Sequence, residues 1–466
     1  MNKIIIFLGA GAIFLTSTHI NAQNFIEETL KEPIQRAIIK SAEVRMQEMM
    51  SNATQMDMEA VKGKRLPQIS FMGGYGFLSS QLSPKFPTQY LPITGTPFLE
   101  DALVSNFQTQ AFMGMLSARQ VIFAGNQINN GIKALEEKQK AEHFLAEAGK
   151  EEIAKEVIDT FDQLMLLKEV DKLINDSEKR LNTEYNKVIK AIENGLAIPY
   201  DRDKIKLAML ELDEKKLEAE GNKNVLLAKL EYLTAMTKSE LESIQYQLQS
   251  FFVSEISSNT ENRAEVKALK AVKKAKEFAY KKEKGSYLPT VFAFGNITYI
   301  NAFDTSIKFR DVPVAGDVTL NAEHIRVEPA AAIGVGLKWD IFHGNTNTKN
   351  IKKSEIELEI SDTKLKDTQE KLELLLFKSK SDFKTAEQKV LVARQRTKIA
   401  DNNLQLATKQ FNAGLVDVTE RLASENEFYK VNLNYYNQIL NQRSAALNLL
   451  LVTGDLLNKI NNENEN

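Results

Sequence analysis

Residues capable of chemistry are plentiful in this sequence, but their spacing does not form a catalytic or metal site. The four histidines, His19, His143, His324 and His343, stand far apart, and none belongs to an HExxH pair. The sequence contains no phosphate-binding loop and no GxSxG motif. It also has no cysteine that could bind a metal or form a disulfide. The sequence therefore predicts no enzyme, no metal ligand and no cofactor.

Two acidic residues stand out because each follows a glycine–leucine pair at the same distance. Asp201 lies six positions after the glycine of Gly195-Leu196, and Glu420 lies six positions after the glycine of Gly414-Leu415. One interpretation is a first-turn acid that stabilises the start of a helix through the helix dipole. The equal spacing also indicates that the two regions are copies of one another.

Other motifs recur at nearly the same offset and show that the chain is a tandem duplication. The paired segments are Ala42–Val44 with Ala264–Val266, Arg65–Pro67 with Tyr287–Pro289, and Phe123–Asn126 with Phe342–Asn345. We expect a first repeat over 23–236, an equatorial connecting segment over 237–262, a second repeat over 263–454 and a polar C-terminal tail over 455–466.

Each repeat has the pattern of a helix, two strands and two long helices. In the strands, large apolar residues alternate with small or polar ones, which is the period of a strand that has one apolar face. The apolar set includes Phe71, Tyr75, Phe77, Phe112, Leu116, Ile122, Ile333, Val335, Leu337, Trp339 and Ile341. The proline- and glycine-containing segments 80–108 and 302–328 are expected to be outward-facing loops.

The helical regions are unusually long. Uninterrupted helical patterns cover about 124–193 and 345–412, and some 70 residues correspond to roughly 105 Å of helix. Shorter helices are expected over 196–236, 415–454 and 263–287, so that two stacked short helices would match one long helix in length. The lysines Lys267, Lys270, Lys273, Lys274 and Lys276 are expected to form the solvated face of a coiled coil.

The N-terminal segment is typical of a signal peptide. Lys3 is followed by an apolar stretch over Ile4–Leu15 and a small residue at Ala22. That stretch is too short to cross about 30 Å of hydrocarbon. We expect export with cleavage after residue 22, and we expect any later membrane span to be a β-structure.

This order of elements resembles the TolC-like outer-membrane efflux proteins over nearly all of the mature chain. The resemblance rests on the duplication, on Leu-Pro before the first strand of each repeat, on Phe-x-Gly after the second, and on the Gly-Leu helix tips. It implies a mixed α and β fold: a trimeric 12-stranded transmembrane β-barrel, with four strands per chain, continuous with an α-helical coiled-coil tunnel in the periplasm of a Gram-negative cell. It also implies a homotrimer in outer-membrane lipid that works with a periplasmic adaptor (membrane fusion) protein and an inner-membrane pump, either proton-driven or ABC.

The resemblance also assigns roles to the tip residues. Asp201 and Glu420 would form the periplasmic gate, and Gly195, Leu196, Gly414 and Leu415 would be the tips where the adaptor docks. The sequence departs from the family pattern in the second repeat. The position for a further acid is Ala423, and the position for a basic partner is Val416.

Two other functions remain as alternatives to an exit duct for small molecules such as drugs. The chain could be the exit duct of a type I protein-secretion system, or a periplasmic coiled-coil scaffold or adaptor. Its 60 basic and 62 acidic residues give a formal net charge of -2, which argues against nucleic acid as a partner.

Overall fold

The computed structural model describes residues 27–82, 87–99, 105–251, 259–312 and 316–461. The predicted signal peptide over 1–22 lies outside them. The order of elements in the first repeat is η1 Glu28–Leu30, α1 Lys31–Lys40, α2 Ala42–Gly63, β1 Gln68–Leu82, β2 Gln89–Tyr90, β3 Pro97–Leu99, β4 Ser105–Ala124, α3 Gln127–Glu193 and α4 Pro199–Thr234. The connecting segment contains α5 Lys238–Ser243. The second repeat contains α6 Ala264–Lys284, η2 Gly285–Tyr287, β5 Thr290–Val312, β6 Gly316–Lys338, α7 Thr346–Asn412 and α8 Val418–Thr453, and α9 Leu456–Asn461 follows it.

The two repeats have matching helices. α3 and α7 each have 67 residues, and α4 and α8 each have 36 residues. The expected long and short helices are therefore confirmed to within a few residues. Within the described residues, no helix is long and apolar enough to cross a membrane.

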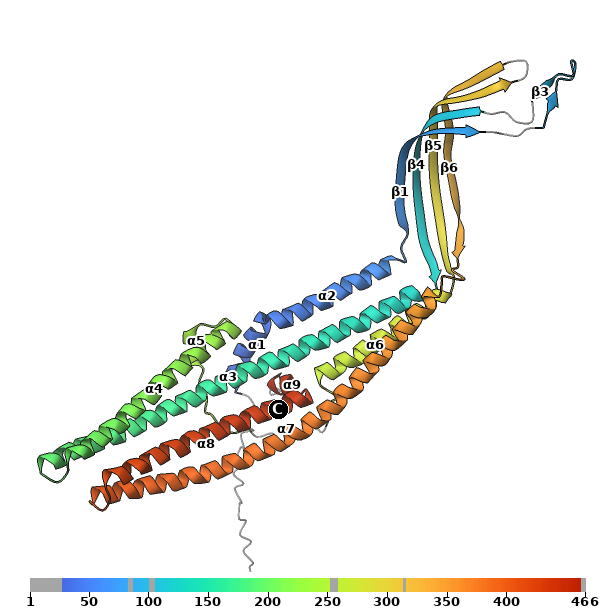
Figure 1. Cartoon of the computed structure of the whole chain (residues 1–466). Helices are drawn as coiled ribbons and strands as arrows, with labels where there is room; N and C mark the ends of the chain where they lie inside the picture. Colours follow the sequence, from blue (N-terminus) through green and yellow to red (C-terminus); the bar gives the residue numbers. More distant parts are fainter. Residues whose placement is uncertain (1–26, 83–86, 100–104, 252–258, 313–315, 462–466) are drawn as a thin grey trace, which may run out of the picture. The chain divides into compact units, whose positions relative to one another are not determined.

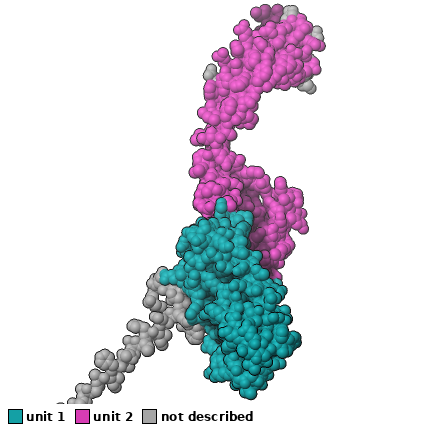
Figure 2. All heavy atoms as spheres, turned by 90° about the vertical axis from the view of Figure 1, so that its left-hand side faces the viewer, with its two compact units in different colours: residues 1–46, 146–266, 368–466 teal, residues 47–145, 267–367 magenta. Residues whose placement is uncertain are grey.

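The chain folds into two compact units, each of which contains equivalent pieces of both repeats (Figure 2). One unit comprises residues 1–46, 146–266 and 368–466, and the other comprises residues 47–145 and 267–367. We call them the helical unit and the sheet unit. The duplication thus builds each unit from two related halves.

The sheet unit contains a four-stranded antiparallel sheet in the order β1-β4-β5-β6 (Figure 1). Its register places Phe71, Leu116, Ile297 and Ala331 side by side in one row. The neighbouring row, on the opposite face, contains Ser70, Ser117, Asn296 and Ala332, and the two serine hydroxyls lie 2.8 Å apart. The predicted alternation is therefore realised in these rows of β1, β4 and β5, whereas β6 has alanine in both rows. Trp339 and Ile341, which were expected to continue the alternation, lie after the end of β6.

The apolar face of this sheet is exposed. Ile69, Phe71, Phe77 and Val335 all have well over half of their surface accessible, and Ile333 is 94% exposed. An apolar sheet face without a covering layer indicates a surface for lipid or for another protein.

Two features differ from the sequence prediction. The segment 302–328 is not a loop, because β5 and β6 continue as a paired hairpin to Val312 and Gly316. Its residues alternate less regularly than those nearer the helices, which is why the proline and glycine there suggested a turn. In the first repeat, the predicted loop 80–108 contains the short pair β2 and β3 and the start of β4.

The expected polar tail is also wrong in its first part. Residues 456–461 form α9, and Leu456 and Ile460 are buried in the main hydrophobic core. The asparagines and glutamates around these two apolar residues masked the short helix in the sequence. Gly454, at φ +72°, ends α8 and redirects the chain into α9.

The core of the helical unit is formed by apolar faces of helices from both repeats. Leu30 and Ile34 near the N-terminus pack with Phe161 and Leu164 of α3 and with Leu447 of α8. A second, smaller cluster lies nearer the helix tips and contains Leu181, Val188, Ile205 and Val418. These clusters fix α3, α4 and α8 relative to one another within the unit.

Candidate functional site

The two helix tips have the same backbone structure. After α3, the N–H of Gly195 donates to the carbonyl of Ile192 at 3.0 Å, and the N–H of Leu196 donates to Ala191 at 2.8 Å. After α7, Gly414 and Leu415 make the equivalent bonds at 3.0 and 2.9 Å. Both glycines have φ of +71°. This is the Schellman arrangement, in which glycine supplies the left-handed residue that ends the helix.

The tip leucines point into solvent. Leu196 is 83% exposed and Leu415 is 75% exposed, although a leucine side chain gains free energy by being buried. Two equivalent exposed leucines on rigid turns form a surface suited to contact with another protein.

A cavity of about 350 Å³ lies between the two tips. Leu196, Asp201 and Gly414 line it, together with Lys187, Phe411 and Asp417. The structure therefore brings one predicted gate acid and both predicted tips to the same hollow.

Asp201 also stabilises the start of its own helix. Its carboxylate accepts the backbone N–H of Ile198 at 3.3 Å, at the residue before α4 begins. The predicted first-turn role is thus present, while the gate role stays a prediction.

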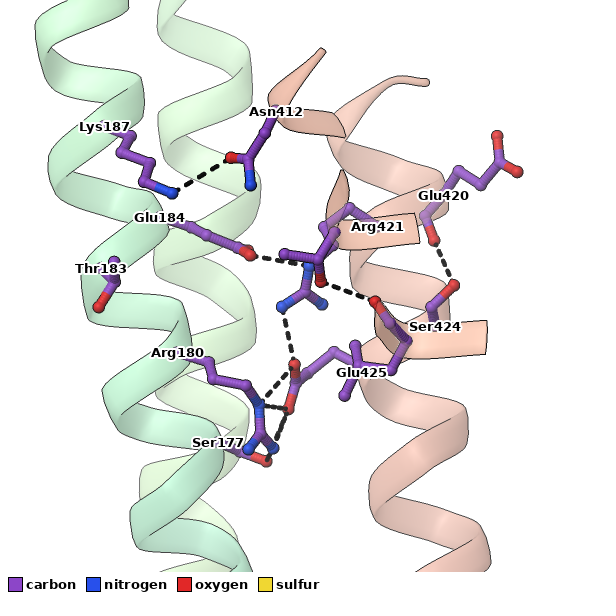
Figure 3. Close-up of polar contacts among 12 residues, drawn as sticks. Ser177, Arg180, Thr183, Glu184, Lys187, Asn412, Glu420, Arg421, Ser424 and Glu425 are labelled. Atoms are coloured by element: carbon purple, nitrogen blue, oxygen red, sulfur yellow. Dashed lines mark hydrogen bonds and ion pairs between the residues drawn. The ribbon is translucent and has the colours of Figure 1, made fainter. Parts of the chain in front are cut away.

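Glu420 is exposed and lies in the first turn of α8. Its backbone N–H is capped by Asp417 Oδ1 at 2.9 Å, so Asp417 rather than Glu420 caps this helix. In Figure 3 the Glu420 side chain points away from the polar residues between α3 and α8. Within one chain, Asp201 and Glu420 are therefore not brought together.

A buried ionic network joins α3 to α8 just behind the tips (Figure 3). Arg421 is 0% exposed; its Nε donates to Glu184 Oε1 at 2.8 Å and its Nη2 donates to Glu425 Oε2 at 2.9 Å. Glu425 also accepts hydrogen bonds from Arg180 at 2.6 Å and from Ser177 at 2.8 Å. We call these five residues the tip network. It contains two positive and two negative side chains and connects the first repeat to the second.

The protein environment shifts the pKa values of the two carboxylates in opposite directions. Burial raises the pKa of Glu184, and the attraction of Arg421 offsets only part of this. Burial would also raise the pKa of Glu425, but the hydrogen bonds from Arg180 and Ser177 hold its pKa below the usual value. Glu425 is therefore the carboxylate of the tip network that stays ionised to lower pH, and Glu184 is the one that is protonated more easily.

Sequence reasoning missed the tip network, although a signal was present. On α3, Ile174, Ser177, Leu181, Glu184 and Val188 follow one another at steps of three and four. A polar residue at a position of the apolar seam is buried when that face packs against another helix. Once buried, it needs a hydrogen-bond or ion-pair partner. Arg421 and Glu425 interrupt the seam of α8 in the same way, between Val418 and Tyr429.

Comparison with known proteins agrees with this architecture. The model of the family described as outer membrane efflux protein matches residues 319–455, within the second repeat. Among curated proteins, none matches this chain in sequence.

Several solved structures share the fold over nearly the whole chain. CusC, whose structures concern transmembrane channel formation, is 12% identical with a TM-score of 0.71, and the match covers 92% of this chain and 93% of CusC. VceC, an outer membrane protein of Vibrio cholerae, is 14% identical with a TM-score of 0.68 over 91% and 96% of the two chains. The CmeC outer membrane channel of Campylobacter jejuni is 12% identical with a TM-score of 0.69 over 100% and 98%.

The fold and the family match together define the class of this protein: it has the fold of the outer-membrane efflux channels, with an antiparallel sheet and long helices in each chain. The predicted resemblance to the TolC-like efflux proteins is confirmed, and the outer-membrane location that it implied agrees with the family and the structures that match. The matching family is described as an efflux protein, and CusC and CmeC are described as forming channels, which agrees with the prediction that the chain is not an enzyme.

Proposed function

We propose that this chain is the outer-membrane exit duct of a three-component export system, which carries small molecules such as drugs out of the periplasm or from an inner-membrane pump. The observation that carries the proposal is the sheet with one exposed apolar face, around Phe71 and Ile333, and an opposite face on which small and polar residues such as Ser70 and Asn296 stand beside Phe292 and Phe294. A strand set of this kind suits a barrel whose outside contacts lipid and whose inside contacts water.

The proposed assembly is a homotrimer. β1 and β6 are the two edges of the sheet, and each has a strand neighbour on one side only among the described residues. Four strands are fewer than the eight or so that the smallest membrane barrels require, and unpaired edges are not tolerated in lipid. Pairing β6 of one copy with β1 of the next closes the edges, and the family resemblance favours three copies with 12 strands in total.

The proposed docking site for a periplasmic adaptor is the pair of tips. Leu196 and Leu415 are exposed, equivalent and held on rigid turns, and the cavity between the tips offers an apolar residue, Phe411, beside Lys187 and Asp201. An adaptor with complementary apolar tips would bury both leucines.

The proposed gate lies in the same region. Glu420 is exposed on α8 away from α3, so copies of it from three chains would form an acidic ring, while Asp201 would bind groups of the neighbouring chain. The tip network would hold α3 and α8 together when the duct is closed. Opening would then require these ionic contacts to stretch or exchange.

A type I protein-secretion duct would use the same fold, so only the identity of the exported molecule distinguishes it from a duct for small molecules. A periplasmic scaffold is disfavoured by the sheet, because a soluble protein would not leave a face such as that around Phe71 and Ile333 uncovered.

The test is export in a Gram-negative strain that lacks its own exit channel and carries the cognate adaptor and pump. Wild-type protein is expected to lower the accumulation of a fluorescent drug. Leu196→Asp combined with Leu415→Asp is expected to abolish this effect while the protein still reaches the outer membrane. The matched control is Leu217→Asp combined with Leu374→Asp, because these leucines are also exposed but lie on helices away from the tips.

Full export by the tip variant would contradict tip docking. Failure of the wild type to export any drug, together with release of a secreted protein that depends on it, would favour the secretion duct.

A further inference from the structure

Six cations gather where the helices of the sheet unit meet its strands. Lys62, Lys64 and Arg65 lie at the end of α2 and just after it, and Lys281, Lys282 and Lys284 lie in the last turn of α6. All six side chains are exposed. We call them the basic collar. Lys62 and Lys284 occupy equivalent positions of the two repeats, and the other four cations have no cationic counterpart.

The two halves of the collar flank the start of α3. A methyl group placed on Gly131 would lie 3.6 Å from Val61 Cγ1, at the end of α2, and 3.8 Å from Lys282 Cδ, at the end of α6. Arg65 donates a hydrogen bond to Asn129 Oδ1 on α3. Two helix ends, those of α2 and α6, therefore present their cations on the two sides of the start of α3.

The collar is poorly neutralised by acids. Lys282 pairs with Glu283 at 3.2 Å, whereas Lys281 and Lys284 lie over the rings of Phe278 and Tyr280. Within the described ranges, Lys62 and Lys64 have no acid within ion-pair distance. Other lysines of α6 differ, since Lys273 pairs with Asp362 at 2.7 Å and Lys276 pairs with Glu357 at 2.8 Å.

An exposed apolar rim adjoins the collar on the side of the strands. Leu66 and Leu288 each lie two residues before β1 and β5, Trp339 directly follows β6, and Phe342 lies four residues after its end. Trp339 keeps its polar edge satisfied, because Nε1 donates to the carbonyl of Tyr287 at 3.0 Å. Aromatic residues of this kind sit at the boundary between hydrocarbon and head groups, and lysines just beyond them reach the phosphates.

We propose that the basic collar binds the head groups of anionic phospholipids in the periplasmic leaflet of the outer membrane. The proposal rests on the membrane location of the sheet and goes beyond it by naming the lipid chemistry and the residues. Three copies of the chain would place the collar around the whole circumference of the duct. Such a ring fixes the depth of the barrel in the membrane through charge as well as through apolar area.

The experiment uses the intrinsic fluorescence of Trp339, the single tryptophan of the chain. Full-length protein is reconstituted in two kinds of phosphatidylcholine vesicle. One contains brominated phosphatidylglycerol and the other contains brominated phosphatidylcholine, and the bromine atoms quench tryptophan fluorescence on contact. At equal mole fraction and low salt, we expect brominated phosphatidylglycerol to be preferred about fivefold or more at this site, since each lysine near a surface contributes substantially to anionic lipid binding.

Two variants separate the collar from general charge. The first variant combines Lys62→Gln, Lys64→Gln and Lys281→Gln. We expect it to bring the preference for phosphatidylglycerol over phosphatidylcholine close to a ratio of one, and we expect high salt to do the same. Lys378→Gln, Lys384→Gln and Lys398→Gln together remove the same charge from exposed positions of α7 and are expected to leave the preference unchanged.

The outcomes distinguish this proposal from the proposed function. Quenching by both brominated lipids without preference would overturn the collar and leave the membrane location intact. An equal loss of preference in the two triple variants would also overturn it. No quenching by either lipid would overturn both proposals, because Trp339 would then lie away from the bilayer.

Discussion

Arg421 of α8 donates from Nε to Oε1 of Glu184 on α3 at 2.8 Å, and both side chains are buried although they lie close to exposed helix tips. The bond joins the second repeat to the first within one chain. Arg421 Nη1 and Glu184 Oε2 have no hydrogen-bond partner in the described part of the chain. The contact is therefore strong in geometry but not fully saturated with hydrogen bonds.

Replacing Arg421 should loosen the tips. Arg421→Met leaves Glu184 and Glu425 buried with less compensation, and breaking a buried ion pair in this way typically costs about 3–5 kcal/mol. We expect a lower unfolding temperature by far-ultraviolet circular dichroism. The control is Arg202→Met, whose partner Asp203 is exposed and whose loss should be nearly neutral. Equal stability of the two variants would contradict the role assigned to the tip network.

A second buried arginine fixes the connecting segment to the helical core. Arg443 binds Asp162 at 2.7 Å and the carbonyl of Gln249 at 3.0 Å, and the neighbouring Gln442 forms two hydrogen bonds with the backbone of Phe251, at 2.8 and 2.7 Å. The predicted equatorial segment is therefore tied down in its described part up to residue 251.

Removing the Gln442 side chain should release that segment locally. Gln442→Ala is expected to speed hydrogen exchange at the Phe251 amide by more than tenfold, because the amide loses its acceptor. Gln438→Ala, one helical turn away and bonded to Asn434, should leave the exchange unchanged. Unaltered exchange at Phe251 in the first variant would show that other contacts hold the segment.

Glu151 predicts a pH dependence of stability. This side chain of α3 is 6% exposed, and burial, followed by repulsion from Glu265, raises its pKa to about 7. Arg263 opposes the shift, while Asp455 and Glu147 add to it. In the unfolded chain the carboxyl titrates near its ordinary value of 4.5. Its contribution to stability is thus complete below pH 4.5 and is lost as the pH rises through about 7.

Glu151→Gln should therefore match the wild type at acid pH and exceed it in stability above neutral pH by about 3 kcal/mol. The measurement is the difference in unfolding temperature between variant and wild type from acid to mildly alkaline pH. Glu152→Gln changes an exposed acid beside it and should show no such trend. A constant difference at all pH values would contradict the assignment to Glu151.

Two equivalent glycines give a test of the junction between strands and helices. Gly125 and Gly344 both have positive φ, at +58° and +56°. A Cβ on Gly125 would lie 2.1 Å from the carbonyl oxygen of Gly285, whereas a Cβ on Gly344 meets nothing within 4 Å. Gly344→Ala should cost only about 1 kcal/mol for its backbone conformation. Gly125→Ala should cost several times more and reduce the yield of folded protein. Equal yields would mean that the Gly125–Gly285 contact is not required.

The fold was predictable because its signals are local and repeated. The Gly195 and Gly414 turns, the strand alternation around Phe71 and Ile333, and the long helical periods each follow from short-range chemistry. The tip network was not predicted, because Arg421 pairs with residues of the other repeat, and sequence spacing does not show which helix faces which. α9 was missed because Leu456 and Ile460 gain their stability from a core formed by distant segments.

The most direct test of the channel is single-channel conductance of the detergent-extracted protein in planar bilayers, for the wild type and for Asp201→Ala combined with Glu420→Ala. The account predicts small cation-selective currents in the wild type and larger, less selective currents in the variant, because removing the acids opens the proposed gate. Currents unchanged by the substitutions would retain the channel and contradict the gate. Failure of well-folded protein to insert and conduct would contradict the exit duct itself.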